Sequence, residues 1–183
     1  MNVIFGGGVA GLAAAIGAEG NALLLERNQY CGKKLLLSGS GKCNVTNAVE
    51  KEGFLQRLGE FRNWLKPAFY SFDNEALMDL LEQAGCPIVV REDSKVFPLS
   101  MRASAVRDTL LKLATSKGTK ILYDTPVQSL EQTGAKITLH LTNKEHILAD
   151  KVIIACGGSS YPQTGSDGSS YSLANNIDRK SVV

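Results

Sequence analysis

Glycines spaced as Gly6-x-Gly8-x-x-Gly11 directly follow the apolar run Asn2 to Phe5. Apolar residues then recur at helical spacing from Val9 onward, so the glycines fall in a turn between a strand and a helix. We expect Gly6 to permit the tight turn, Gly8 to let the backbone approach a pyrophosphate, and Gly11 to let the helix pack closely on the strand. Amide groups at the helix N-terminus attract phosphate. The pattern therefore predicts a dinucleotide-binding turn.

An acidic residue, Glu26, follows the second apolar run, Ala22 to Leu25, twenty positions after Gly6. A carboxylate in this place accepts hydrogen bonds from the ribose hydroxyls of NAD or of the adenosine half of FAD, and it repels a ribose 2′-phosphate. The alternative is a glycine turn that only joins strand to helix. Strand, helix and acidic residue together favour the nucleotide site.

A second glycine-rich segment, residues 32–47, reads GKKLLLSGSGKCNVTN. Its glycines permit close approach of a ligand, and its cationic and neutral donors suit a phosphate or the rim of a flavin ring. A polar surface loop with solvated lysines explains the same composition equally well. The residues alone leave both interpretations open for Lys34, Ser38, Lys42 and Asn44.

The composition is that of an ordinary globular protein, with 183 residues, 44% hydrophobic, 21% charged and a formal charge of +2. Near-neutral charge without a basic run gives no reason to expect nucleic acid as a partner. No apolar run approaches the roughly 20 residues that cross a bilayer, and no secretory leader follows Met1. We therefore expect a cytoplasmic protein without a membrane partner, and the sequence indicates no protein partner.

Cysteine and histidine are too scattered for a metal site or a disulfide framework, because no Cys-x-x-Cys pair is present. We predict no metal site and interpret the cysteines as reduced, packed thiols. We name no catalytic residue, since His140 and His146 fall on predicted strand surfaces. The cysteines are Cys31, Cys43, Cys86 and Cys156.

The remaining patterns predict an α/β fold. Continuous apolar runs over Lys120 to Tyr123 and Val152 to Ala155 are typical of further strands in a parallel sheet. Between them, Val127 to Ala149 has hairpin spacing, which predicts an antiparallel meander of three strands. We expect the middle of the chain to lie outside this sheet.

The residue patterns of this middle region predict three helices and one or two short strands. One helix carries apolar residues along one side, and a second begins after a possible Asp73 cap. The apolar positions are Phe54, Leu58, Phe61 and Leu65 in the first, and Leu77, Leu80, Leu81 and Ala84 in the second. One or two strands over Pro87 to Phe97 and a helix over Ala103 to Ala114 follow.

The chain carries, in order, the segments GGGVAGLAAAI, LLLERN, GKKLLLSGSGKCNVTN, VFPLSMRASAV and VIIACGGSSYPQTGSDG. Together they closely resemble the bacterial YhiN/HI0933-like flavoprotein family, which includes aminoacetone oxidases and BaiN-like NAD(P)/FAD-dependent bile-acid-intermediate reductases. The resemblance implies a Rossmann-type FAD-binding domain of the two-dinucleotide-binding flavoprotein type, with the meander as its second sheet. It also implies an FAD-dependent oxidoreductase, with NAD(P)H as a candidate electron donor.

The resemblance further implies which residues contact the cofactor. Cys156 stands where the family has a threonine in an ATGG-like turn, a change that removes a hydroxyl but leaves the glycines. The matched positions are Gly6, Gly8, Val9, Ala10 and Gly11 at the pyrophosphate, Glu26 at the ribose, Lys34, Ser38, Gly39, Lys42, Cys43 and Asn44 along the flavin half, Val127 at the adenine, and Ala155 and Gly157 near the cofactor.

Family chains are longer, with a substrate domain and a closing glycine-rich segment. We therefore expect residues 1–177 to form an incomplete FAD-binding domain with a helical insertion at about 50–100, and 178–183 to be a non-native tail. The chain alone should bind FAD weakly and be inactive. Its expected function is flavin-mediated two-electron transfer on a small organic substrate. An NAD-dependent dehydrogenase and a non-catalytic dinucleotide-binding module are the alternatives.

Overall fold

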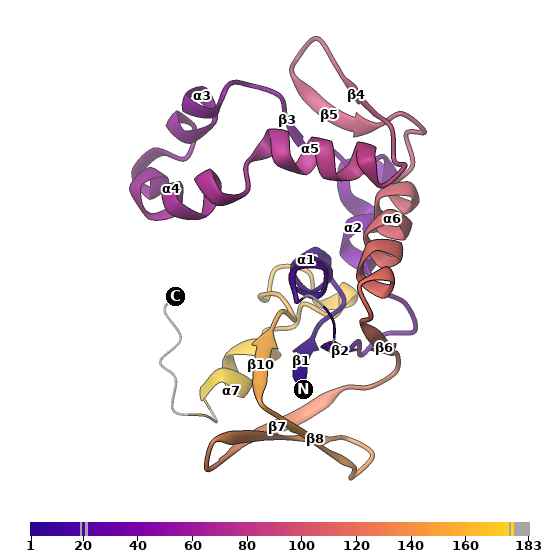
Figure 1. Ribbon diagram of the computed structural model, residues 1–183, viewed down its shortest axis with the longest axis vertical. Coiled ribbons are helices and arrows are strands. Elements are labelled where there is room, and N and C mark those ends of the chain that lie inside the picture. The colour runs from indigo at the N-terminus through magenta and orange to yellow at the C-terminus, as the bar shows by residue number, and fades with distance from the viewer. Residues whose placement is uncertain (19, 21, 176, 178–183) are drawn as a thin grey trace. The chain divides into compact units, whose positions relative to one another are not determined.

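A computed structural model describes residues 1–18, 20, 22–175 and 177 (Figure 1). The predicted tail over 178–183 lies outside the described residues. The chain forms two compact units, one made of Met1–Leu35 with Leu110–Val183 and the other of Leu36–Thr109.

The first unit contains a parallel sheet with the strand order β10-β1-β2-β6. Helix α1 (Val9–Gly17) connects β1 to β2, which completes the predicted βαβ unit. The two central strands, β1 and β2, are deeply buried, as expected for parallel strands, and Val3, Ile4 and Leu24 have no exposed surface. The outer strands β6 and β10 are less buried than predicted, because each has a neighbour on one side only, and Leu122 and Ile153 are 45% and 41% exposed. The strands are β1 (Asn2–Phe5), β2 (Ala22–Leu25), β6 (Lys120–Leu122) and β10 (Lys151–Ile154).

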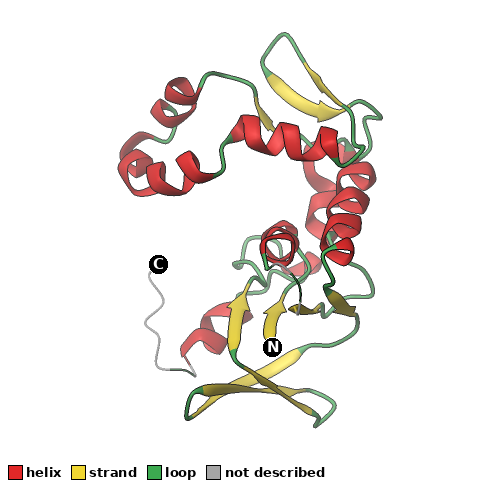
Figure 2. Ribbon diagram, in the orientation of Figure 1, coloured by secondary structure: helices red, strands yellow, loops and turns green. Residues whose placement is uncertain are grey.

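The predicted meander is also confirmed, because β7, β8 and β9 pair antiparallel in chain order (Figure 2). Leu130, Leu139 and Leu141 of the meander share one buried cluster with Phe5 and Leu25 of the parallel sheet. Apolar contact therefore holds the two sheets together. The strands are β7 (Val127–Thr133), β8 (Lys136–Leu141) and β9 (His146–Ala149), and they contain the two histidines as predicted.

In the second unit, the prediction of one continuous helix through Phe54 and Leu65 is wrong. Helix α3 (Lys51–Gln56) ends early, a 3₁₀ turn covers Gly59–Phe61, and α4 (Arg62–Ser71) then begins. Gly59 has a φ of +56°, a left-handed conformation that an α-helix cannot include. The apolar spacing therefore spans a break, and Phe61 and Leu65 are 61% and 41% exposed.

The following helix agrees with its predicted start. Helix α5 (Asn74–Gln83) begins after Asp73, whose Oδ1 accepts from the Ala76 N–H at 2.9 Å. Where the sequence predicted one or two short strands, two strands are present and pair antiparallel, β4 (Ile88–Val90) and β5 (Lys95–Pro98).

The sequence patterns missed several short elements. They are β3 (Thr46–Asn47), which pairs with β5, and α2 (Lys33–Leu37), a 3₁₀ turn at Pro162–Thr164 and α7 (Ser169–Asn175). Helix α6 (Ala103–Ser116) matches its prediction and extends two residues further. Among the described residues, no helix is long and apolar enough to span a membrane.

Candidate dinucleotide-binding site

The glycine turn between β1 and α1 has the geometry that the spacing predicts at Gly6 and Gly11. Gly6 has a φ of +109°, and a Cβ there would lie 2.7 Å from the Cα of Cys156 and would collide with the Ala155 carbonyl. A Cβ at Gly11 would overlap the Gly6 carbonyl oxygen. Packing of strand, turn and helix therefore excludes a side chain at both positions.

Gly8 differs from these two glycines, because packing does not exclude a side chain there. Apart from its neighbours in the chain, no described atom lies within 4 Å of the position that a Cβ would occupy. It is the N-cap of α1 and has ordinary extended dihedrals, with φ −74° and ψ −176°. Val9 and Ala10, in the first helical turn, are exposed. The N-terminus of α1 is thus open to a phosphate group, and this fits the predicted pyrophosphate site.

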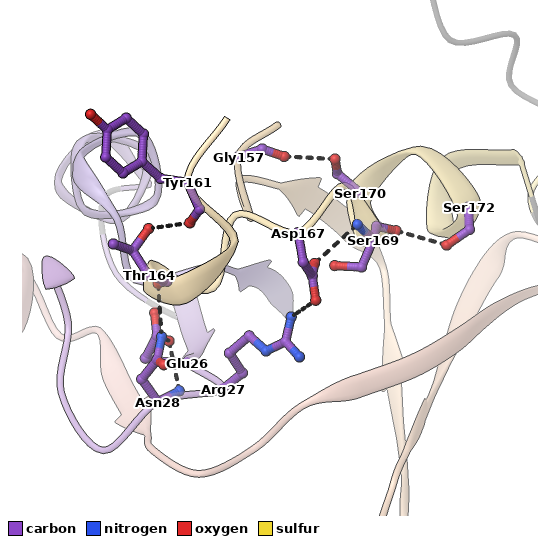
Figure 3. Close-up of polar contacts among 10 residues, drawn as sticks. All are labelled: Glu26, Arg27, Asn28, Gly157, Tyr161, Thr164, Asp167, Ser169, Ser170 and Ser172. Carbon is purple, nitrogen blue, oxygen red and sulfur yellow. Dashed lines mark hydrogen bonds and ion pairs between the residues drawn. The ribbon is translucent and has the colours of Figure 1, made fainter. Parts of the chain in front are cut away.

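Glu26 follows β2 and is only 5% exposed. Its Oε2 accepts from the Gly7 N–H at 2.7 Å, and its Oε1 accepts from the backbone N–H and the side-chain amide of Asn28 at 2.7 and 2.6 Å (Figure 3). The carboxylate is therefore fixed beside the glycine turn. A dinucleotide ribose needs an acceptor in this place.

Gly7 is a site residue that the glycine pattern left unassigned. A Cβ at this position would lie 2.8 Å from Glu26 Oε2 and would collide with the Cys31 sulfur. Its amide also donates to Glu26, so both its missing side chain and its N–H are used. The run of three successive glycines was the available signal.

The end of β10 lies against the same turn. The Ala155 N–H donates to the Phe5 carbonyl at 2.9 Å, and Gly157 has a φ of +77°. A Cβ at Gly157 would lie 2.7 Å from Ser166 Oγ. Cys156 between them is partly buried, and burial raises the pKa of its thiol. Ala155 therefore lies against the glycine turn, and the contact of Ala155 and Gly157 with a cofactor stays a prediction.

The loop after β10 returns to the end of β2 (Figure 3). Arg27 forms an ion pair with Asp167 at 2.6 Å, and the Asn28 side chain donates to the Thr164 carbonyl at 3.4 Å. Hydrogen bonding from Ser169, followed by that from Arg27, lowers the pKa of Asp167 to about 2. No sequence signal marked these contacts, because 140 positions separate Arg27 from Asp167.

Lys34 also contacts this loop. Its Nζ donates to Ser160 Oγ at 3.2 Å and lies 5.3 Å from the ring centre of Tyr161, which is a cation–π distance. Of the donors predicted for the flavin half, Lys34 is the one that belongs to the same unit as the glycine turn.

The other predicted flavin contacts belong to the unit Leu36–Thr109. A 3₁₀ turn covers Ser38–Gly41, and Ser40 and Cys43 adopt the left-handed conformation, with φ of +55° and +60°. Non-glycine residues in this conformation are strained and cluster at functional sites. Their alignment along a flavin stays a prediction for Ser38, Gly39, Lys42, Cys43 and Asn44.

Two residues of this segment have evident structural roles. The Asn44 amide, with its nitrogen toward the strands, donates to the carbonyls of Thr46 and Val96 at 3.0 and 3.3 Å. Cys43 is 2% exposed, and burial raises the pKa of its thiol. A raised pKa disfavours the reactive thiolate, in agreement with a packing role for this cysteine.

Val127 begins β7 and packs beside the cluster shared by the two sheets. The segment that leads to it runs beside the end of β2, since the Thr125 N–H donates to the Glu26 carbonyl at 2.9 Å. Val127 follows two residues after this contact with the Glu26 backbone. Its contact with adenine stays a prediction.

Comparison with known proteins identifies relatives of this chain. The chain is 32% identical to a 3-dehydro-bile acid delta(4,6)-reductase of Clostridium scindens, over 95% of this chain and 43% of the relative. It is 27% identical to a ribosomal RNA dihydrouridine synthase of Escherichia coli, over 94% and 43%. The chain therefore spans less than half the length of these relatives.

Among solved structures, Thermovibrio ammonificans THI4 is similar in fold, with a TM-score of 0.56 and 14% identity over 85% of this chain and 57% of that one. Residues 1–182 match the family described as HI0933-like protein Rossmann domain. Because this match covers nearly the whole sequence, the chain belongs to the HI0933-like family and contains its Rossmann domain.

Proposed function

We propose that this chain is the cofactor-binding part of an FAD-dependent oxidoreductase that acts on a small organic substrate. The observation that carries the proposal is the open N-terminus of α1 at Gly8 beside the fixed Glu26 carboxylate. Backbone amides suit a pyrophosphate and the carboxylate suits a ribose, as the two halves of a dinucleotide require. When bound, the flavin supplies two-electron transfer.

The chain's own residues then bind and orient the cofactor. Val9 and Ala10 offer exposed amides for the pyrophosphate, and Glu26 offers an acceptor for the ribose. Lys34 is a cation held at the C-terminal edge of the sheet by the loop after β10. It is suited to the negatively charged phosphate or to the polar rim of the flavin.

The names of the relatives favour one reaction class. Both a delta(4,6)-reductase and an enzyme that forms dihydrouridine reduce a carbon–carbon double bond. We propose reduction of a double bond conjugated to a carbonyl group for the protein to which this chain corresponds. We further propose that NAD(P)H donates the electrons and that this chain alone is inactive.

The test of the cofactor is spectroscopic. The purified chain is titrated with FAD while the visible flavin spectrum and the flavin fluorescence are recorded, and NADH is titrated in parallel. A perturbed flavin spectrum on addition of FAD supports the proposal, whether or not NADH also gives a response. A response to NADH alone would favour a nicotinamide-dependent dehydrogenase. FAD binding without turnover in a longer relative would favour a non-catalytic module.

The absence of a nucleic-acid partner stays a prediction, although one relative is named for ribosomal RNA. The formal charge of +2 gives little general attraction to a polyanion. Fluorescence anisotropy with a labelled RNA hairpin at about 0.15 M salt tests this prediction. Specific, saturable binding under these conditions would contradict it.

A further inference from the structure

Asn28 makes two contacts to the same oxygen of Glu26. Its backbone N–H and its side-chain amide donate to Oε1 at 2.7 and 2.6 Å. The Glu26 side chain is otherwise held by the Gly7 N–H at Oε2. Asn28 therefore supplies two of these three hydrogen bonds to the side chain of Glu26, a residue that is only 5% exposed.

The number of acceptor sites on this carboxylate is limited. An ionised carboxylate offers about four lone-pair sites on its two oxygens. Among the described residues, three N–H groups occupy such sites, two of them at Oε1 and one at Oε2. Of the two oxygens, Oε2 therefore accepts fewer of these hydrogen bonds than Oε1.

Asn28 is itself held in place by the loop after β10. Its Nδ2 lies 3.4 Å from the Thr164 carbonyl, and a Cβ at Gly165 would lie 3.0 Å from the same nitrogen. The neighbouring Arg27 is paired with Asp167 of this loop. Figure 3 shows these contacts converging on the segment that follows β2.

We propose that Asn28 is a positioning residue that orients Glu26 so that a single ribose hydroxyl of the cofactor binds at Oε2. The inference rests on the proposed function, because it requires an adenosine-containing cofactor at this site. It goes further in assigning a role to Asn28 and in limiting the ribose contact to one hydroxyl.

The experiment compares ADP, 2′-deoxy-ADP and 3′-deoxy-ADP as probes of the adenosine half. Affinities are measured by NMR titration of the ¹⁵N-labelled chain, a method that also covers weak binding. For the unaltered protein, one deoxy analogue should bind about tenfold more weakly than ADP, and the other within about twofold. In Asn28→Ala, the affinity for ADP should fall, and the three ligands should bind with nearly equal affinity.

Asn143→Ala is the matched control, because Asn143 also contacts a glutamate two positions away, with its Nδ2 3.0 Å from Glu145 Oε2. This variant should leave all three affinities unchanged. Asn28→Ser is a second variant, which also removes the amide donor, for the case that Asn28→Ala does not fold.

The outcomes separate the two proposals. If the unaltered chain binds neither FAD nor ADP, the proposed function fails and the inference fails with it. If the chain binds ADP but both deoxy analogues lose affinity equally, the single contact at Oε2 is refuted. If the Asn28 variants lose thermal stability but keep the unaltered ratio between ligands, Asn28 has only a structural role and the inference is overturned.

Discussion

The Gly7 N–H donates to Glu26 Oε2 at 2.7 Å, which joins the turn after β1 to the residue after β2. A turn that binds pyrophosphate and an acceptor that binds ribose can hold one dinucleotide only when they lie at the spacing of these two groups. The absence of a side chain at Gly7 permits this contact, since a Cβ would lie 2.8 Å from the same oxygen. The Gly7 amide thus fixes the position of the Glu26 carboxylate relative to the glycine turn.

Gly8→Val should abolish binding of FAD and ADP without unfolding the protein. No described atom lies within 4 Å of the Gly8 Cβ position, so the side chain would occupy only the space expected for the pyrophosphate. The cost in stability should be about 1 kcal/mol, because valine is a poor N-cap residue. Flavin fluorescence titration and thermal unfolding measure the two effects. Retained FAD affinity would contradict the assignment of Gly8.

Gly11→Ala should destabilise the protein by about 1–3 kcal/mol or more, because the added carbon would overlap the Gly6 carbonyl oxygen. Gly17→Ala is the matched control in the same helix, since no described atom lies within 4 Å of its Cβ position. It should be neutral or stabilise by up to about 1 kcal/mol. Chemical denaturation compares the two variants. Equal stabilities would refute the close contact at Gly11.

Glu26→Gln should weaken ADP binding and raise the relative affinity for adenosine 2′,5′-bisphosphate. The substitution removes the negative charge that repels a 2′-phosphate. It also turns an amide N–H₂ toward the donors of Gly7 or Asn28, which should cost about 1–3 kcal/mol of stability. Calorimetric titration with both ligands measures the preference. An unchanged ratio of affinities would show that Glu26 does not face the ribose.

The Asp167 carboxylate, which accepts a hydrogen bond from Ser169 and forms an ion pair with Arg27, should stabilise the protein at neutral pH and lose its effect in acid. Because the pKa of Asp167 is lowered from 3.8 to about 2, the folded state favours the ionised carboxylate. Its contribution is complete above the unfolded value and disappears as the pH falls from about 4 to 2. Both side chains are over one-third exposed, so solvent screening limits the contribution to about 1 kcal/mol or less.

The comparison of the unaltered protein with Asp167→Asn at several pH values measures this contribution. The difference in unfolding free energy should be constant from pH 5 to pH 8 and should shrink toward pH 2. Added salt at about 1 M should reduce the difference at neutral pH as well. A difference that grows in acid would have the wrong sign for a carboxylate with a lowered pKa.

The sequence alone determined the elements and residues that depend on neighbours in the chain. The glycine turn, the buried parallel strands and the meander follow from residue spacing, because backbone conformation and burial repeat with the period of the element. Glu26 was found for the same reason, since the βαβ unit fixes the distance in sequence between turn and acceptor. The broken helix near Gly59 was missed because apolar spacing does not register a single left-handed residue.

Only the tertiary structure decided how the site is held together. Lys34 meets Ser160 over 126 positions, and Arg27 meets Asp167 over 140. Asn28 contacts Glu26 over only two positions, but the fold also brings the Thr164 carbonyl to 3.4 Å from the Asn28 side-chain nitrogen. Such contacts form between loops at one edge of the sheet, where the chain positions depend on strand order and not on local periodicity. Residue spacing therefore specifies the glycine turn and the position of Glu26, whereas the tertiary structure decides that the loop after β10 packs against Arg27 and Asn28.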